Sequence, residues 1–99
     1  MAQYDVYPIP RGTGWLLDLQ SDLLDVIGTR VVAPLVPLAE AQTRAGRLNP
    51  VFRIEGEEVV MLAQSLAAVP TSILKERCAN LAQHHDKITA ALDMVFLGF

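Results

Sequence analysis

Short apolar stretches with the length and composition of β-strands fill most of the chain. Residues 3–7 alternate polar and apolar, with Tyr4 and Val6 on one side, as expected for a strand buried on one face. Similar short apolar runs, bounded by turn residues, predict further strands over residues 15–20, 30–35, 51–54, 59–62 and 69–74. The chain therefore begins as a series of antiparallel strands.

The segments between these strands carry turn signals. Proline and glycine residues over 8–14 interrupt the first ladder, and Glu55-Gly56-Glu57 predicts a hairpin in which Gly56 takes a positive φ. Pro34 has no N–H to donate, so its nitrogen side is expected to face away from a neighbouring strand. Residues 38–47 leave two possibilities open, a short helix or an irregular crossing.

The last twenty residues change to the period of a helix. Leu81, Ile88, Leu92 and Val95 fall on one helical face, and Gly98 stands where a helix end often has a left-handed residue. The final residues, 96–99, are largely apolar. Chain ends are normally exposed, so this end is expected to pack on a second subunit or a partner.

The composition favours one small domain over residues 1–99 that pairs with a copy of itself. Of the 99 residues, 52% are apolar and 19% are charged. A monomer of this size has a thin core, so a homodimer interface is the natural place for the excess apolar surface. The net charge of −3 argues against direct nucleic-acid binding. The lack of a long apolar run or signal peptide, and a single cysteine, favour a cytoplasmic protein that does not bind membranes.

The residues that could carry chemistry do not form a recognisable site. His84 and His85 are adjacent, so on a helix they point about 100° apart and cannot bind one ion together. Asp22 and Asp25 are better explained by turn hydrogen bonds beside Ser21 than by acid–base catalysis. The sequence therefore predicts no catalytic residues, no metal and no cofactor.

Five segments share their order and spacing with a known family. The first ends a strand in Gln-Ser-Asp, two aliphatic residues and Asp, and the last ends a helix in an aromatic residue, a variable residue, Gly and an apolar residue. The segments are residues 16–25, 30–35, 50–54, 68–70 and 91–99. Together they resemble the CcdB family of toxins over almost the whole chain, from Tyr4 to Phe99.

The resemblance implies a fold and a function. The fold is mainly β (α+β), an SH3-like antiparallel β-barrel with one C-terminal α-helix, and the protein is a homodimer. The function is that of a type II toxin–antitoxin toxin, which binds the DNA gyrase A subunit and traps gyrase on cleaved DNA. A CcdA-type antitoxin neutralises it. The family's gyrase contacts map onto Leu23, Leu24, Asp93, Phe96, Leu97, Gly98 and Phe99.

Three of these positions differ from the best-known family pattern. Leu97 stands where a Trp would stack on a gyrase arginine, Asp93 replaces an Asn, and Phe99 replaces an aliphatic residue. A cation–π contact of about 1–2 kcal/mol is lost with the Trp. The affinity for gyrase is therefore expected to fall or shift.

Two alternatives remain at this stage. The chain could be an interaction protein that retains only antitoxin binding. It could also be a ribonuclease toxin, which needs an acid–base pair and a positive group beside the phosphate. Arg30, Arg53, Asp22, His84 and His85 are the available residues, and no spacing links them.

Overall fold

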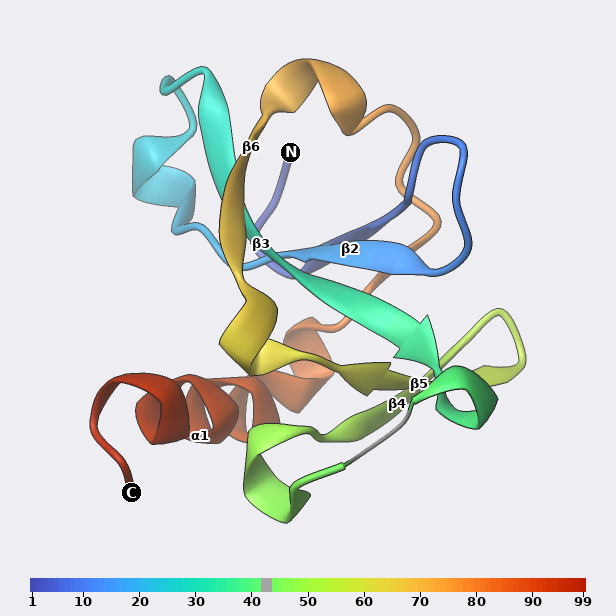
Figure 1. The fold of residues 1–99 in the computed structure, drawn as a ribbon. Helices are drawn as coiled ribbons and strands as arrows, with labels where there is room; N and C mark the ends of the chain where they lie inside the picture. The colour runs from blue at the N-terminus through green and yellow to red at the C-terminus, as the bar shows by residue number, and fades with distance from the viewer. Residues whose placement is uncertain (42–43) are drawn as a thin grey trace.

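Seven strands form a nearly closed antiparallel β-barrel, and one helix packs against it (Figure 1). This computed structural model describes residues 1–41 and 44–99. The elements are β1 (Asp5–Pro8), β2 (Trp15–Asp18), β3 (Thr29–Pro37), β4 (Val51–Ile54), β5 (Glu57–Met61), β6 (Ala67–Pro70), β7 (Ala79–Asn80) and α1 (His85–Phe96). The expected mainly β fold with one C-terminal helix is confirmed.

The long strand β3 connects the two halves of the sheet. The strand order is β4-β5-β3-β2-β1-β7, with β6 also paired to β3. One edge of β3 pairs with β2, while its other edge pairs first with β6, over residues 29–32, and then with β5, over residues 35–37. Pro34 lies between these two pairings, and its carbonyl accepts from the amide of Leu62 at 2.9 Å. Its missing N–H therefore falls where β3 changes partners. The sequence predicted only that this nitrogen would face away from a neighbouring strand, and not the change of partner.

A tight turn joins β4 to β5. Ile54 pairs with Glu57, so Glu55 and Gly56 form a two-residue turn with φ values of 52° and 82°. Two positive φ values match the turn type that follows the twist of paired strands. The predicted hairpin and the left-handed Gly56 are confirmed.

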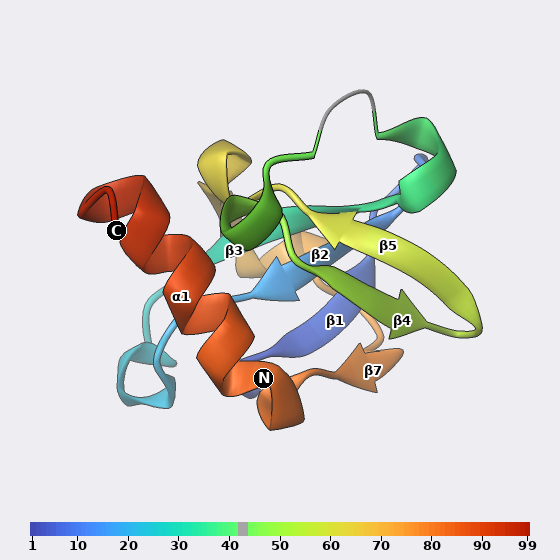
Figure 2. The same cartoon turned by 90° about the horizontal axis from the view of Figure 1, so that it is seen from below.

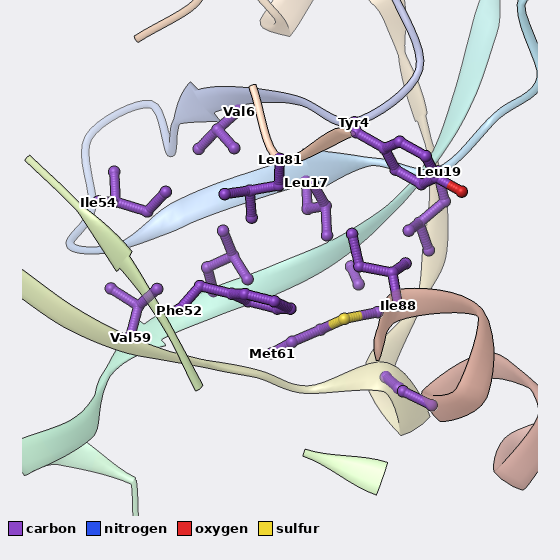
Figure 3. Packing of buried hydrophobic residues seen from close by; sticks show 14 residues of the cluster. Tyr4, Val6, Leu17, Leu19, Phe52, Ile54, Val59, Met61, Leu81 and Ile88 are labelled. Carbon is purple, nitrogen blue, oxygen red and sulfur yellow. The ribbon is translucent and has the colours of Figure 1, made fainter. Parts of the chain in front are cut away.

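The main core fills the space between the barrel strands and α1 (Figures 2 and 3). Val6, Leu17, Val59 and Ile88 are completely buried there. A second cluster covers the opposite face of β1 and β2 and consists of Tyr7, Leu16, Val32 and Leu74. Both faces of β1 are consequently buried. The prediction of a strand buried on one face only was wrong, because the segment around Leu74 packs over its second face.

The end of the predicted strand 69–74 is also different. β6 ends at Pro70, and a 3₁₀ turn, η5 (Thr71–Ile73), follows it. The Thr71 amide bonds to the carbonyl of Gly28 at 3.1 Å and the Leu74 amide to that of Thr71 at 3.0 Å. This turn brings Leu74 into the second cluster, which a continued strand would not do.

The helix begins later than the apolar period indicated. Leu81 precedes it, with its amide bonded to the carbonyl of Tyr4 at 2.9 Å, next to the two-residue strand β7. A 3₁₀ turn, η6 (Ala82–His84), then leads into α1. Leu81 is nevertheless buried in the main core, so its burial was predicted correctly and its conformation was not.

The region 38–47 contains 3₁₀ turns where the structure describes it. These are η2 (Leu38–Glu40) and part of η3 (Gly46–Leu48). Residues 42 and 43 lie outside the described residues. The two possibilities left open by the sequence, a short helix or an irregular crossing, can therefore be compared with the structure only at the other residues of this region. No helix within 1–41 or 44–99 is long and apolar enough to cross a membrane.

Candidate partner-binding site

The first part of the candidate site is the aliphatic loop, residues 21–28, between β2 and β3. It contains a 3₁₀ turn, η1 (Asp22–Leu24), whose first residues are capped by Ser21: the Ser21 hydroxyl accepts from the amide of Leu23 at 3.2 Å. Asp22 accepts from the backbone amide of Gln3 at 2.7 Å. The expectation that Asp22 serves a local turn was therefore wrong, because its carboxylate joins the loop to the start of the chain.

Four aliphatic side chains of this loop point into solvent. Leu23 and Val26 are 90% and 92% exposed, and Leu24 and Ile27 are about half exposed. Large apolar side chains gathered on one exposed loop are typical of a contact surface. The sequence analysis selected Leu23 and Leu24 but missed Val26 and Ile27. The signal that could have found them is the position of two apolar residues between Asp25 and Gly28, within a loop.

A buried ion pair lies behind the loop. Arg30 Nη2 is 2.7 Å from Asp18 Oδ2, and Arg30 Nε donates to both carboxylate oxygens at 3.2 and 2.9 Å. Burial raises the pKa of the Asp18 carboxyl, and the hydrogen bonds from Arg30 oppose this shift. The side chain of Gln20 reaches from the same strand region to the Leu24 carbonyl, with Nε2 to O at 2.9 Å.

This polar group was also missed in the sequence. Leu16, Asp18 and Gln20 alternate with Leu17 and Leu19, so they share one face of the strand. A charged residue within an otherwise apolar strand could have indicated a buried pair.

Tyr7 and Asp5 extend the polar group into the second cluster. Burial, together with the negative charges of Asp5 and Asp18, raises the pKa of Tyr7 to about 12. Burial alone would raise the pKa of Asp5, but hydrogen bonds from Asn80, the Ala2 amide and Arg77 together place it below its usual range. This side of the sheet thus holds the ionised carboxylate of Asp5 beside the neutral phenol of Tyr7.

The second part of the candidate site is the end of α1. Asp93 is exposed, and its carbonyl accepts from the amides of Leu97 and Gly98 at 2.7 and 3.1 Å. Gly98 has a φ of 82°, the left-handed conformation that the sequence predicted. Phe96, Leu97 and Phe99 are 69%, 59% and 76% exposed. Within this chain the apolar end is therefore largely uncovered.

The two parts of the site lie on the same side of the molecule but are not packed together. Figures 1 and 2 both draw η1 and the end of α1 toward one side, separated from each other. The sequence-predicted residues thus form two groups, Leu23 with Leu24, and Asp93 with residues 96–99. A single chain offers two apolar surfaces that one large partner could span.

The residues considered for catalysis or metal binding are dispersed. Arg30 is buried and paired with Asp18, whereas Arg53 lies 3.5 Å from Glu58 on the exposed β4–β5 hairpin. His85 Nδ1 is 2.6 Å from the Tyr4 hydroxyl, and His84 lies against the Phe52 ring. In the described part of the chain, no three His, Cys, Asp or Glu side chains gather as a metal site would require.

The fold is similar to that of solved toxin structures. An endoribonuclease in complex with its cognate antitoxin, from a mycobacterial species, matches with a TM-score of 0.78 at 13% identity, over 97% of this chain and 94% of that one. The Mycobacterium tuberculosis toxin MazF-mt6 matches with a TM-score of 0.75 at 13% identity, over 93% of this chain and 95% of that one. At this identity the likeness concerns the fold alone. Residues 3–98 match the family model described as CcdB protein, and the chain therefore belongs to the CcdB family.

Proposed function

We propose that this chain is a type II toxin that binds the DNA gyrase A subunit and traps gyrase on cleaved DNA. Membership of the CcdB family places it among the toxins of toxin–antitoxin systems. The observation that carries the finer proposal is the pair of exposed apolar surfaces at the positions where the family's gyrase contacts map. Leu23 on η1 and Phe96 on α1 are 90% and 69% exposed, so both are available to a partner.

The chemistry of these surfaces suits a protein partner. Aliphatic and aromatic side chains that are exposed in the free protein can serve as interface anchors, and a few such anchors carry most of the binding energy. Asp93 adds an exposed carboxylate next to the apolar end of α1. A basic or amide group of the gyrase A subunit is the matching contact at this position.

Two further partners belong to the proposal. The toxin forms a homodimer, which is supported by the apolar share of 52% in a chain of only 99 residues, more than a monomer of this size easily buries. A CcdA-type antitoxin neutralises it, and the structurally similar mycobacterial endoribonuclease is itself held by a cognate antitoxin. No step of the mechanism requires an enzyme activity, because a protein that blocks gyrase acts by binding.

The test is a plasmid cleavage assay with purified gyrase and the purified chain. Addition of the chain should yield linear, gyrase-bound DNA, and a Leu24→Ser variant should yield at least about tenfold less, since removal of an interface anchor costs about 2 kcal/mol or more. Leu38→Ser, at an apolar position on η2 on the far side of the molecule in Figures 1 and 2, serves as the matched control.

Expression of the same chains in bacteria, beside the cleavage assay, separates the alternatives. Growth arrest with intact gyrase activity and degraded total RNA would contradict the proposal in favour of a ribonuclease. Normal growth, no linear DNA and retained antitoxin binding would identify an interaction protein instead.

A further inference from the structure

The aliphatic loop receives little support from side-chain packing. Residues 22–29 are all exposed, and the next buried residue is Arg30. A segment with few buried contacts is held mainly by its hydrogen bonds, and it moves when these are lost. The position of Leu23 and Leu24 therefore depends on how the loop backbone is bonded to the barrel.

Three hydrogen bonds join the loop to the barrel. At its start, the Gln3 amide donates to Asp22 Oδ1 at 2.7 Å, and at its end, the Thr71 amide donates to the Gly28 carbonyl at 3.1 Å. In the middle, Gln20 Nε2 donates to the Leu24 carbonyl at 2.9 Å. Across the described residues, this is the one hydrogen bond from a barrel side chain to residues 23–27.

Gln20 is itself fixed from two sides. Its Oε1 accepts from the Val31 amide at 3.1 Å, so the amide group is oriented with its nitrogen toward the loop. Its backbone N–H donates to Asp18 Oδ1 at 3.0 Å, and its carbonyl accepts from Arg30 Nη2 at 3.2 Å. The buried Asp18–Arg30 pair thus fixes the backbone of Gln20, whose side chain in turn bonds to the loop.

We infer that Gln20 is a positioning residue for partner binding, which acts through the Leu24 carbonyl to keep the four aliphatic side chains of the loop in their binding arrangement. This inference rests on the proposed function, in which the loop contacts the gyrase A subunit. A loop that is already ordered before binding loses less conformational freedom in the complex, so the affinity is higher.

Two substitutions test the contact in different ways. Gln20→Glu keeps the length and the acceptor for the Val31 amide but removes the donor to Leu24. Gln20→Asn keeps the amide but shortens the side chain by one methylene, so that it no longer reaches. Gln83→Glu, the same change at an exposed position of η6, is the matched control for charge. Ile88→Val, which removes one methyl group from the main core, is the control for lowered stability.

Two measurements are made on each chain. Backbone ¹⁵N order parameters of residues 23–27 should fall from rigid values near about 0.85 toward about 0.6 in both Gln20 variants. Their affinity for the purified gyrase A subunit should fall at least about tenfold. The parent values should persist in Gln83→Glu and Ile88→Val, and antitoxin-free chains of all variants should remain folded by circular dichroism.

The outcomes are distinct. Unchanged order parameters in the Gln20 variants would overturn the inference, and so would mobile loops that bind gyrase A as tightly as the parent. If Ile88→Val loosens the loop equally, the effect is one of stability and the inference is wrong. Failure of the parent chain to bind gyrase A would refute the proposed function, and the order parameters alone would then decide whether Gln20 holds the loop. Should Gln20→Glu not fold, Gln20→Asn gives the decision.

Discussion

Removal of the C-terminal tip, residues 97–99, should separate partner binding from folding. Leu97 and Phe99 are 59% and 76% exposed, so their loss uncovers little of the main core. The hydrogen bonds from the amides of Leu97 and Gly98 to the Asp93 carbonyl are also lost. They share one acceptor that water can reach, and together they contribute about 1 kcal/mol. The new carboxylate at the helix end costs about 0.3–1 kcal/mol.

The free energy of unfolding should therefore fall by only about 1–2 kcal/mol, which is roughly 4–16 °C in the melting temperature of a domain of this size. The loss of binding should be much larger. Two anchors removed from the interface cost about 2–4 kcal/mol, or roughly 30- to 1000-fold in affinity for the gyrase A subunit. A chain that ends at Phe96 should remain folded and bind its antitoxin, but it should no longer arrest growth.

The assay combines thermal melting with a gyrase A pull-down for the parent chain, the truncated chain and the Leu38→Ala control. Intact gyrase binding after truncation would show that residues 97–99 are not the contact. A decrease of several tens of degrees in melting temperature would instead place these residues in a core or a dimer interface, and the reasoning from their exposure would be refuted.

Four further predictions concern assembly, stability and affinity. Light scattering at micromolar concentration should report about twice the chain mass of 10.8 kDa, and a monomer would contradict the proposed dimer. Asp18→Ala should lower the free energy of unfolding by about 3–5 kcal/mol in urea titrations, because it leaves Arg30 buried without its partner; a loss below about 1 kcal/mol would contradict this. The pKa of Tyr7 is raised to about 12 in the folded protein, so folding favours the neutral phenol. This contribution to the free energy of unfolding is complete below pH 10 and is lost as the pH rises toward 12, by up to about 3 kcal/mol. Tyr7→Phe should abolish this pH dependence in alkaline melting curves. Leu97→Trp should tighten gyrase A binding roughly 5- to 30-fold in titrations if it restores stacking on an arginine, and no change would argue against that contact.

Local sequence patterns predicted the fold well at positions where a single residue type determines the backbone conformation. Gly56 gave the hairpin turn, and Gly98 took the left-handed conformation at the end of the helix. In each case the residue allows or forbids a backbone conformation regardless of its distant neighbours. The exposed Leu23 and Leu24 were also predictable, because both lie between aspartates in a loop.

Features that depend on distant segments were not predictable from local patterns. The alternation over residues 3–7 indicated one buried face, but Leu74 packs over the other. The apolar period that predicted the helix also included Leu81. The Leu81 amide instead donates to the Tyr4 carbonyl beside β7. The burial of Arg30 and Gln20 could not be predicted for the same reason. A polar side chain is buried when a hydrogen-bond partner from another segment is available, and these partners, Asp18 and the Val31 amide, are distant in sequence.

The pairing of β1 with β7 has a consequence for how fast the barrel forms. Asp5 and Asn80 are joined by a hydrogen bond across 75 positions of the chain, and Tyr4 and His85 are joined across 81. Such contacts cannot form until a long loop has been closed, and the entropy of closure must be overcome before the contacts contribute. Barrels dominated by distant pairings fold in milliseconds to seconds, whereas helical bundles of similar stability fold far faster. During folding, one edge of β1 therefore stays unpaired until β7, the segment that precedes the helix, has formed its pairing with it.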